Sequence, residues 1–177
     1  NLIQVASCPE CGFSSNDKEH FQRVKSADPN FSIENFKKNW KSKIDPILNK
    51  VKEFGDSFYS EDRDLQQGIL SYEMAIATFE NIAEIMLDEN QKGNFLRKKA
   101  SMLMVQSELL MANKKRDDAE KNLRNVVEIL EPIFEKLKGV DLIHVCLLLF
   151  QIKIYFNDLQ SAAQYMKFMD NYDTEGK

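Results

Sequence analysis

Two cysteines close to the start of the sequence, Cys8 and Cys11, are separated by two residues and followed directly by Gly12. Two thiolates on one tight turn form half of many structural zinc sites, and glycine permits the left-handed backbone beyond the second cysteine. A closed zinc site needs four ligands, and no second pair of this kind occurs in the sequence. His20 is the nearest further ligand candidate, so the sequence predicts a metal group of Cys8, Cys11 and His20 that still lacks one ligand.

The cysteine pair allows two other interpretations. The segment from Cys8 to Gly12 also fits a structural turn that holds no metal, kept after its partner pair was lost or cut away. A redox-active pair is favoured less, because no alternation of strands and helices surrounds it. The third cysteine, Cys146, lies in the apolar segment VCLLLF, which is typical of a small buried hydrophobic residue. Zinc is therefore the only cofactor that the sequence suggests.

The sequence does not predict an enzyme. It contains none of the motifs of a nucleophile elbow, a phosphate-binding loop, a zinc protease or a dinucleotide-binding turn. Acidic neighbours such as Asp117 and Asp118 are adjacent in the chain, so they cannot share one helix face as a catalytic pair would. These acidic side chains are better suited to the N-terminus of a helix, which is the positive end of the helix dipole.

Composition restricts the class of protein and of partner. With 43% hydrophobic and 29% charged residues, the 177-residue chain has the balance of a soluble globular protein. A net charge of −4 and a pI near 5.3 disfavour nucleic acid as a partner, because phosphate binding needs a basic surface. No apolar run reaches the ~18 residues of a membrane span, so none is predicted. The odd number of cysteines favours a reducing compartment, so a cytoplasmic location is expected.

The elements that must position these residues are mostly helices. Apolar residues recur every three or four positions beyond residue 30, which predicts an all-α fold. Residues 1–30 are expected to form a short strand, the half zinc knuckle and a short helix. Residues 31–58 are expected to form linking helices that stop and restart at 45–46. Residues 59–177 are expected to form antiparallel helical hairpins, with Ser60 as the first cap.

Two turns within residues 59–177 resemble each other. A polar turn at 113–118 precedes Ala119, and a turn at 157–158 precedes Ala162, which lies 43 residues later. A small residue at such a position lets two helices approach closely. This part of the chain resembles the tetratricopeptide repeat, although its spacing exceeds the usual repeat length of roughly 34 residues. The resemblance implies an α-solenoid, and a small helical bundle is the alternative.

The order of these features is also similar to that of a known family. A CPxCG turn, a helix containing Asn39–Trp40 and tetratricopeptide-like hairpins resemble the C-terminal part of the bacterial family called domain of unknown function 2225. The resemblance covers Cys8–Gly12 and the general plan. It implies a bacterial, cytoplasmic protein without an assigned activity. It also implies that Cys8 and Cys11 are metal ligands and that an earlier CPxC pair supplies the other half of the site.

The leading functional hypothesis is a non-enzymatic scaffold that binds a peptide or helix of a partner protein on its helical surface. Tyr155, Tyr165, Met166 and Phe168 are the candidate partner-binding residues, because aromatic residues and methionine are enriched at interfaces. Self-association of the helical array is a further possibility. The alternative hypothesis is a zinc-ribbon regulatory or nucleic-acid-binding module whose second knuckle lies outside this chain.

Overall fold

The computed structural model describes residues 5–21, 29–60 and 62–175 of the chain. The chain divides into two units, residues 1–122 (unit 1) and residues 123–177 (unit 2). The described residues form six α-helices, two 3₁₀ helices and one two-stranded hairpin. The predicted all-α fold of antiparallel helical hairpins is therefore confirmed. None of the described helices combines the length and the apolar character that crossing a membrane requires.

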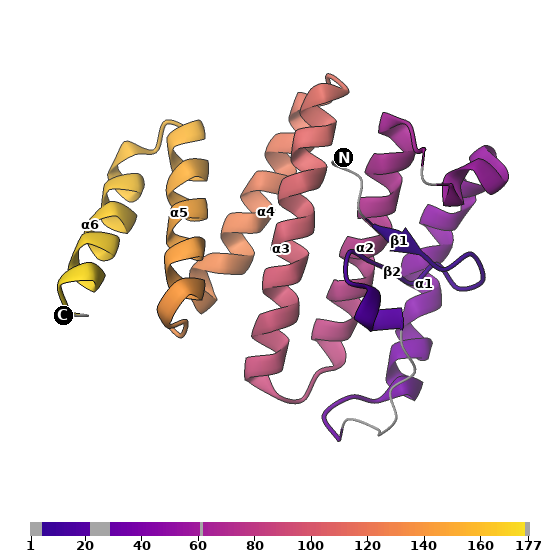
Figure 1. The fold of residues 1–177 in the computed structure, drawn as a ribbon, viewed down its shortest axis with the longest axis horizontal. Coiled ribbons are helices and arrows are strands. Elements are labelled where there is room, and N and C mark those ends of the chain that lie inside the picture. The colour runs from indigo at the N-terminus through magenta and orange to yellow at the C-terminus, as the bar shows by residue number, and fades with distance from the viewer. Residues whose placement is uncertain (1–4, 22–28, 61, 176–177) are drawn as a thin grey trace. The chain divides into compact units, whose positions relative to one another are not determined.

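Unit 1 places α2 between α1 and α3, and successive helices run in opposite directions (Figure 1). A small hairpin of β1 and β2 packs on α2. Because α2 has neighbours on several sides, it is buried along most of its length. The elements of unit 1 are β1 (Ala6–Ser7), β2 (Ser14–Ser15), η1 (Lys18–Phe21), α1 (Ile33–Val51), η2 (Lys52–Tyr59), α2 (Leu65–Ile85), α3 (Glu89–Ala112) and the start of α4 (Arg116–Phe134).

Two clusters of buried side chains hold unit 1 together, and α2 contributes to both. Phe79 is fully buried in the first cluster, which joins α2 to α3 and to the β-hairpin through Val5. Phe58 and Met74 are fully buried in the second cluster, which joins α2 to α1 and η2. Burial of Val5 means that the N-terminal hairpin is part of the core of unit 1.

The predicted interruption at 45–46 was wrong, because α1 is a single helix from Ile33 to Val51 with Pro46 inside it. Proline in a helix interior removes one backbone hydrogen bond. Here Ile44 and Ile47 are both buried against α2, while Pro46 points to solvent. Apolar packing on both sides of the proline therefore keeps the helix continuous.

The cap of α2 also differs from the prediction, which placed it at Ser60. The helix begins at Leu65, and Asp64 accepts a hydrogen bond from the backbone N–H of Gln67 (2.8 Å). The Gln67 side chain accepts one in return from the backbone N–H of Asp64 (2.9 Å). This reciprocal pair is a capping box.

We expect Asp64→Ala to lower the free energy of unfolding by about 1 kcal/mol, because it removes the oxygen that satisfies an N-terminal amide. Ser60→Ala is the matched control, since the Ser60 hydroxyl donates to the Ser57 carbonyl (2.8 Å), which precedes α2 in the chain. Urea unfolding of both variants measures the difference. Equal losses for the two variants would contradict the assignment of the cap.

The two turns that resemble each other in sequence have the same backbone geometry. Lys114 and Asn157 both adopt the left-handed conformation, with φ of 59° and 58°. Each turn carries the two crossed hydrogen bonds of a Schellman motif. These bonds are Lys115 N–H to Leu110 O and Lys114 N–H to Met111 O in one turn, and Asp158 N–H to Lys153 O and Asn157 N–H to Ile154 O in the other. Ala119 and Ala162, five residues beyond each left-handed residue, are both fully buried.

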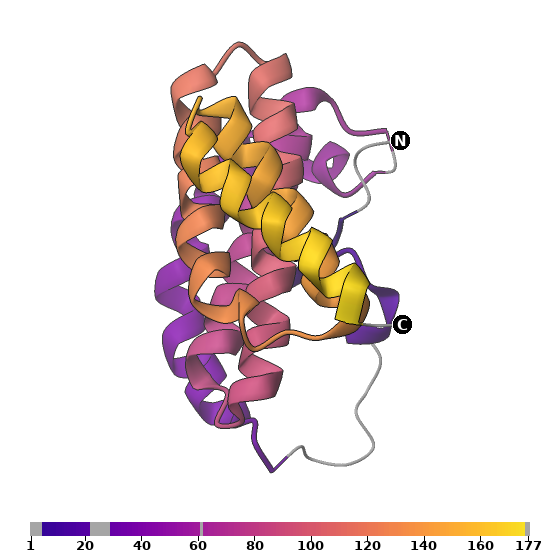
Figure 2. The same cartoon turned by 90° about the vertical axis from the view of Figure 1, so that its left-hand side faces the viewer.

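Unit 2 consists of the second half of α4, α5 (Gly139–Tyr155) and α6 (Leu159–Glu175). Helices α5 and α6 pack against each other in opposite directions, and Figure 2 shows α6 crossing α5 obliquely. Cys146 is fully buried on α5, which confirms its predicted role as a small core residue. Its neighbours in the buried part of α5 include Leu149 and Ile152.

Candidate functional site

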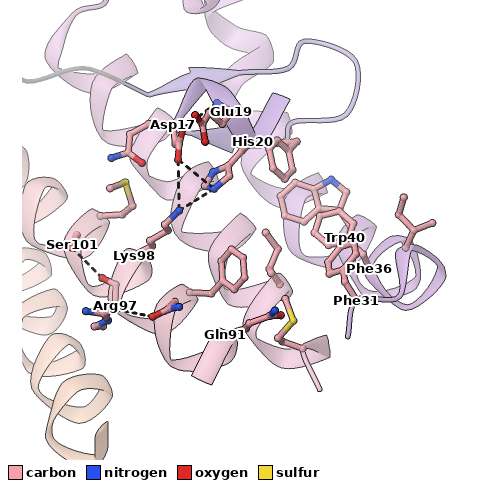
Figure 3. Close-up of a pocket in the computed structure, with 18 of the residues that line it drawn as sticks. Asp17, Glu19, His20, Phe31, Phe36, Trp40, Gln91, Arg97, Lys98 and Ser101 are labelled. Atoms are coloured by element: carbon pink, nitrogen blue, oxygen red, sulfur yellow. Dashed lines mark hydrogen bonds and ion pairs between the residues drawn. The ribbon is translucent and has the colours of Figure 1, made fainter. Parts of the chain in front are cut away.

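A pocket of about 1120 Å³ opens in unit 1 (Figure 3). Its walls come from the β-hairpin, η1, residues 31–40 at the start of α1, the end of α2 and one face of α3. Nine of the 20 lining residues are Phe, Trp, Ile or Met, and the others are Cys11 and ten polar or charged residues. The lining rings are Phe13, Phe31, Phe36, Trp40 and Phe95, and we call this site the aromatic pocket.

One wall of the aromatic pocket is a cluster of rings centred on Phe36. Trp40 lies one helical turn further along α1 and stacks on Phe36, with ring centroids 5.2 Å apart. Phe31 and Phe13 contact Phe36 from the preceding loop and from the β-hairpin, at 6.0 and 6.3 Å. Phe13, Phe31 and Phe36 are only partly buried, so apolar ring surface faces the opening.

The opposite wall is one face of α3. Gln91, Phe95, Lys98 and Met102 recur at intervals of four, three and four residues, so they lie on successive turns of one side of the helix. The Lys98 ammonium lies 5.8 Å from the centroid of the Phe95 ring and 6.0 Å from that of Phe79. Such positions over aromatic faces stabilise a cation.

His20 connects this wall to η1. Its Nδ1 lies 2.6 Å from the hydroxyl of the buried Ser15, and its Nε2 lies 2.9 Å from the Lys98 ammonium (Figure 3). Because an ammonium only donates hydrogen bonds, Nε2 must be the acceptor. Nδ1 then carries the proton and donates to Ser15. Burial, followed by the positive charge of Lys98, lowers the pKa of His20 against the opposing effect of Asp17 and Glu19.

This lowered pKa predicts a pH-dependent stability. The unfolded chain binds the His20 proton more tightly than the folded chain, so stability falls as the pH drops through the unfolded-state pKa of about 6.5. Above that pH the contribution of His20 is fully present. We expect wild type to lose more unfolding free energy between about pH 8 and about pH 5 than His20→Asn, which has no imidazole at this position to protonate. Urea unfolding at both pH values measures this, and an identical loss in both proteins would contradict it.

The cysteine turn, residues 8–12, lies at the edge of the aromatic pocket through Cys11. The Cys8 N–H donates to the Phe13 carbonyl (2.8 Å), and the Gly12 N–H donates to the Cys8 carbonyl (2.9 Å). Gly12 has a φ of 72°, as expected for a glycine after such a pair. The Trp40 indole N–H donates to the Cys11 carbonyl (2.8 Å), which attaches the turn to α1.

The sulfur atoms of the turn have different environments. Burial raises the pKa of Cys8, but hydrogen bonds from the backbone N–H groups of Cys11 and Glu10 to its sulfur outweigh that effect and lower it. Burial is the main cause that raises the pKa of Cys11. Backbone N–H groups directed at a sulfur stabilise a thiolate, which is the form that binds metals.

The fit of this turn to zinc is partial. Among the described residues, no group of three or more His, Cys, Asp or Glu side chains is placed to hold a metal ion. Cys8, Cys11 and His20 are therefore not brought together as a ligand set, and both ring nitrogens of His20 contact Ser15 and Lys98 instead. The cysteine turn offers two sulfur ligands, whereas a structural zinc site needs four ligands.

The four predicted partner-binding residues lie in unit 2 and differ in exposure. Tyr165 is 8% exposed, and its hydroxyl donates to Glu131 Oε1 (2.9 Å). Burial, followed by this contact, raises the pKa of Tyr165. Met166, Tyr155 and Phe168 are exposed. Tyr165 and Phe168 both contact the Phe134 ring edge-on, at 5.7 and 5.6 Å between centroids.

Sequence reasoning missed the aromatic pocket. Trp40 was identified only as part of the Asn39–Trp40 helix in the family resemblance, and Phe13, Phe36 and Phe95 were not singled out. The pattern of apolar residues at helical spacing cannot separate a ring that fills a core from a ring that lines a cavity. The one available signal is the density of aromatic residues between residues 31 and 40.

Comparison with known proteins places the chain in a family. No curated protein and no solved structure matches the sequence. The model of the family described as "Uncharacterized protein conserved in bacteria (DUF2225)" matches residues 1–172. This match covers both units and includes the cysteine turn and every residue of the aromatic pocket. The chain therefore belongs to the DUF2225 family of bacterial proteins.

Proposed function

We propose that this chain is a non-enzymatic protein-interaction module, and that its aromatic pocket binds a segment of a partner protein through bulky apolar side chains. The observation that carries the proposal is the wall of partly exposed rings built from the β-hairpin, α1 and α3. Covering such rings removes apolar surface from water, which is the main favourable term in protein association. Aromatic side chains in pockets are also where binding energy concentrates at interfaces.

The size and lining of the pocket support a peptide rather than a flat surface contact. At about 1120 Å³ it is slightly larger than most pockets that enclose small organic ligands, which span roughly 300–1,000 Å³. Helical scaffolds commonly bind extended or helical segments of their partners in grooves between helices. We also propose that the hairpins with matching Schellman turns are tetratricopeptide-like repeats, supported by the buried Ala119 and Ala162.

Selection from a random peptide library displayed on phage tests this function. We expect the intact chain to enrich peptides that contain Phe, Trp, Leu or Met, and Phe95→Ala to lose that enrichment. Phe168→Ala is the matched control, because it removes an exposed Phe in unit 2 and leaves the pocket unchanged. Circular dichroism of both variants checks that they remain folded. Equal enrichment by Phe95→Ala, or loss with Phe168→Ala, would contradict the proposal.

A second candidate function rests on the cysteine turn. We propose that Cys8 and Cys11 are half of a zinc site in a regulatory module, supported by the N–H groups directed at the Cys8 sulfur. The remaining ligands would come from residues other than those described. The metal content of the purified protein, measured by mass spectrometry for wild type and for Cys8→Ser, tests this idea. Less than one zinc per two chains in wild type, or the same content in the variant, would count against it.

A further inference from the structure

The aromatic pocket has a charge that differs from that of the whole chain. The chain has a net charge of −4. The pocket lining instead includes three cationic side chains and two acidic ones, with His20 neutral. The cationic residues are Lys37, Arg97 and Lys98, and the acidic ones are Asp17 and Glu19. A segment bound in this pocket therefore meets a locally positive lining, which favours a negatively charged group in that segment.

Lys98 is the cation best placed to meet such a group. Its ammonium lies 2.9 Å from His20 Nε2 and 5.8 Å from the centroid of the Phe95 ring, and Figure 3 shows it across the pocket from Phe36 and Trp40. One of its three donors is taken by His20 Nε2 (2.9 Å). The Asp17 carboxylate, which is 40% exposed, already forms an ion pair with this ammonium at 3.8 Å. An ammonium has three donors, so one donor of Lys98 remains for a second carboxylate that approaches from the pocket.

A second polar group on the same face of α3, the side-chain amide of Gln91, suits a bound peptide backbone. Gln91 Oε1 is a buried oxygen that accepts no hydrogen bond from the described residues. Buried acceptors normally have a hydrogen-bond partner, either protein or ordered water. Because Gln91 lines the aromatic pocket, a backbone N–H of a bound segment can supply this hydrogen bond.

The spacing of these two groups limits the segment. Gln91 and Lys98 are seven positions apart on α3, which corresponds to about 10 Å along a helix. An extended chain covers that distance in about three residues. Phe95 lies between them on the same helix face, so the side chain that occupies the middle of the path meets an aromatic ring.

We propose that the aromatic pocket binds an extended segment of a partner protein that carries a bulky apolar residue opposite Phe95 and, about one or two residues away, an acidic residue whose carboxylate pairs with Lys98. This inference rests on the proposed function, which it makes more specific. Gln91 accepts a backbone hydrogen bond from the same segment. The apolar residue supplies most of the affinity, and the acidic residue sets the direction in which the segment lies.

The peptide selection described above tests the inference through a separate readout. Wild type is expected to enrich peptides that combine an apolar residue with Asp or Glu at a constant spacing. Lys98→Gln keeps a donor for His20 but removes the charge, so it is expected to enrich the apolar residue without the acidic one. Lys98→Arg keeps the charge and is expected to restore the acidic preference. Circular dichroism and thermal unfolding confirm that both variants are folded.

Binding constants then measure the size of the effect. For an enriched peptide synthesised with Asp and with Asn, the wild type is expected to bind the Asn form about fivefold more weakly, and Lys98→Gln to bind both forms equally. Enrichment of apolar residues without an acidic preference would overturn this inference and leave the proposed function intact. No enrichment by wild type would overturn both. An acidic preference that survives in Lys98→Gln would also overturn the assignment of Lys98.

Discussion

Replacement of Phe79 by alanine is expected to lower the free energy of unfolding of unit 1 by about 3–5 kcal/mol, because it leaves a cavity in the core. Phe79 is fully buried on α2 and belongs to the cluster that joins α2 to α3 and the β-hairpin. Its ring also contacts two residues that line the aromatic pocket, His20 and Phe95. His20 meets the ring edge-on at 5.8 Å, and Phe95 stacks on it at 6.4 Å.

Urea unfolding followed by tryptophan fluorescence measures this loss in unit 1 alone, because Trp40 is the only tryptophan of the chain. Phe168→Ala is a suitable control, since Phe168 is 38% exposed and lies in unit 2. We expect the control to leave the fluorescence transition unchanged. If Phe79→Ala lowered the free energy of unfolding by less than about 1 kcal/mol, Phe79 would behave as a surface residue, and this would contradict its position in the core.

The second large effect is expected at Gly12 in the cysteine turn. Gly12 has a φ of 72°, and a Cβ added there would lie 2.6 Å from Cγ1 of the buried Ile44. Alanine is therefore disfavoured both by the backbone conformation and by contact with α1. We expect Gly12→Ala to lower the free energy of unfolding by about 2–4 kcal/mol.

The steric part of this effect can be isolated at Ile44. Ile44→Ala removes the Cγ1 and Cδ1 atoms that would lie 2.6 and 3.1 Å from the added Cβ. Gly12→Ala should therefore cost less free energy of unfolding in the Ile44→Ala background than in the wild type, because mainly the backbone conformation then opposes alanine. Equal costs in the two backgrounds would contradict close packing of the cysteine turn on α1.

The helices could be predicted from the sequence because the pattern that produces them is local. Apolar residues at three- and four-residue intervals defined the hairpins, and the resemblance of the two turns around Ala119 and Ala162 holds in three dimensions. Local rules failed where tertiary packing competes with them. Pro46 does not end α1, because buried residues on both sides hold the helix on α2.

Of the candidate site, only the part made of consecutive residues could be predicted from the sequence. The cysteine turn is specified by five consecutive residues, and its backbone has the expected form. The environment of His20 depends on Lys98, which is 78 residues away, so no local pattern could reveal it. The aromatic pocket brings together residues from 11 to 102, and each of its rings looks like an ordinary core residue in the sequence.

The central claim is that the partner segment binds in the aromatic pocket. The most direct test is a ¹H–¹⁵N spectrum of the intact chain during titration with an enriched peptide that lacks tryptophan. Trp40 gives the single indole N–H signal, and this group donates to the Cys11 carbonyl at the pocket edge. We expect that signal to shift in a saturable manner, together with the amide signals of Phe95 and Lys98. Saturable binding that leaves the Trp40 signal unchanged and instead shifts the amides of Tyr155 and Met166 would contradict the account.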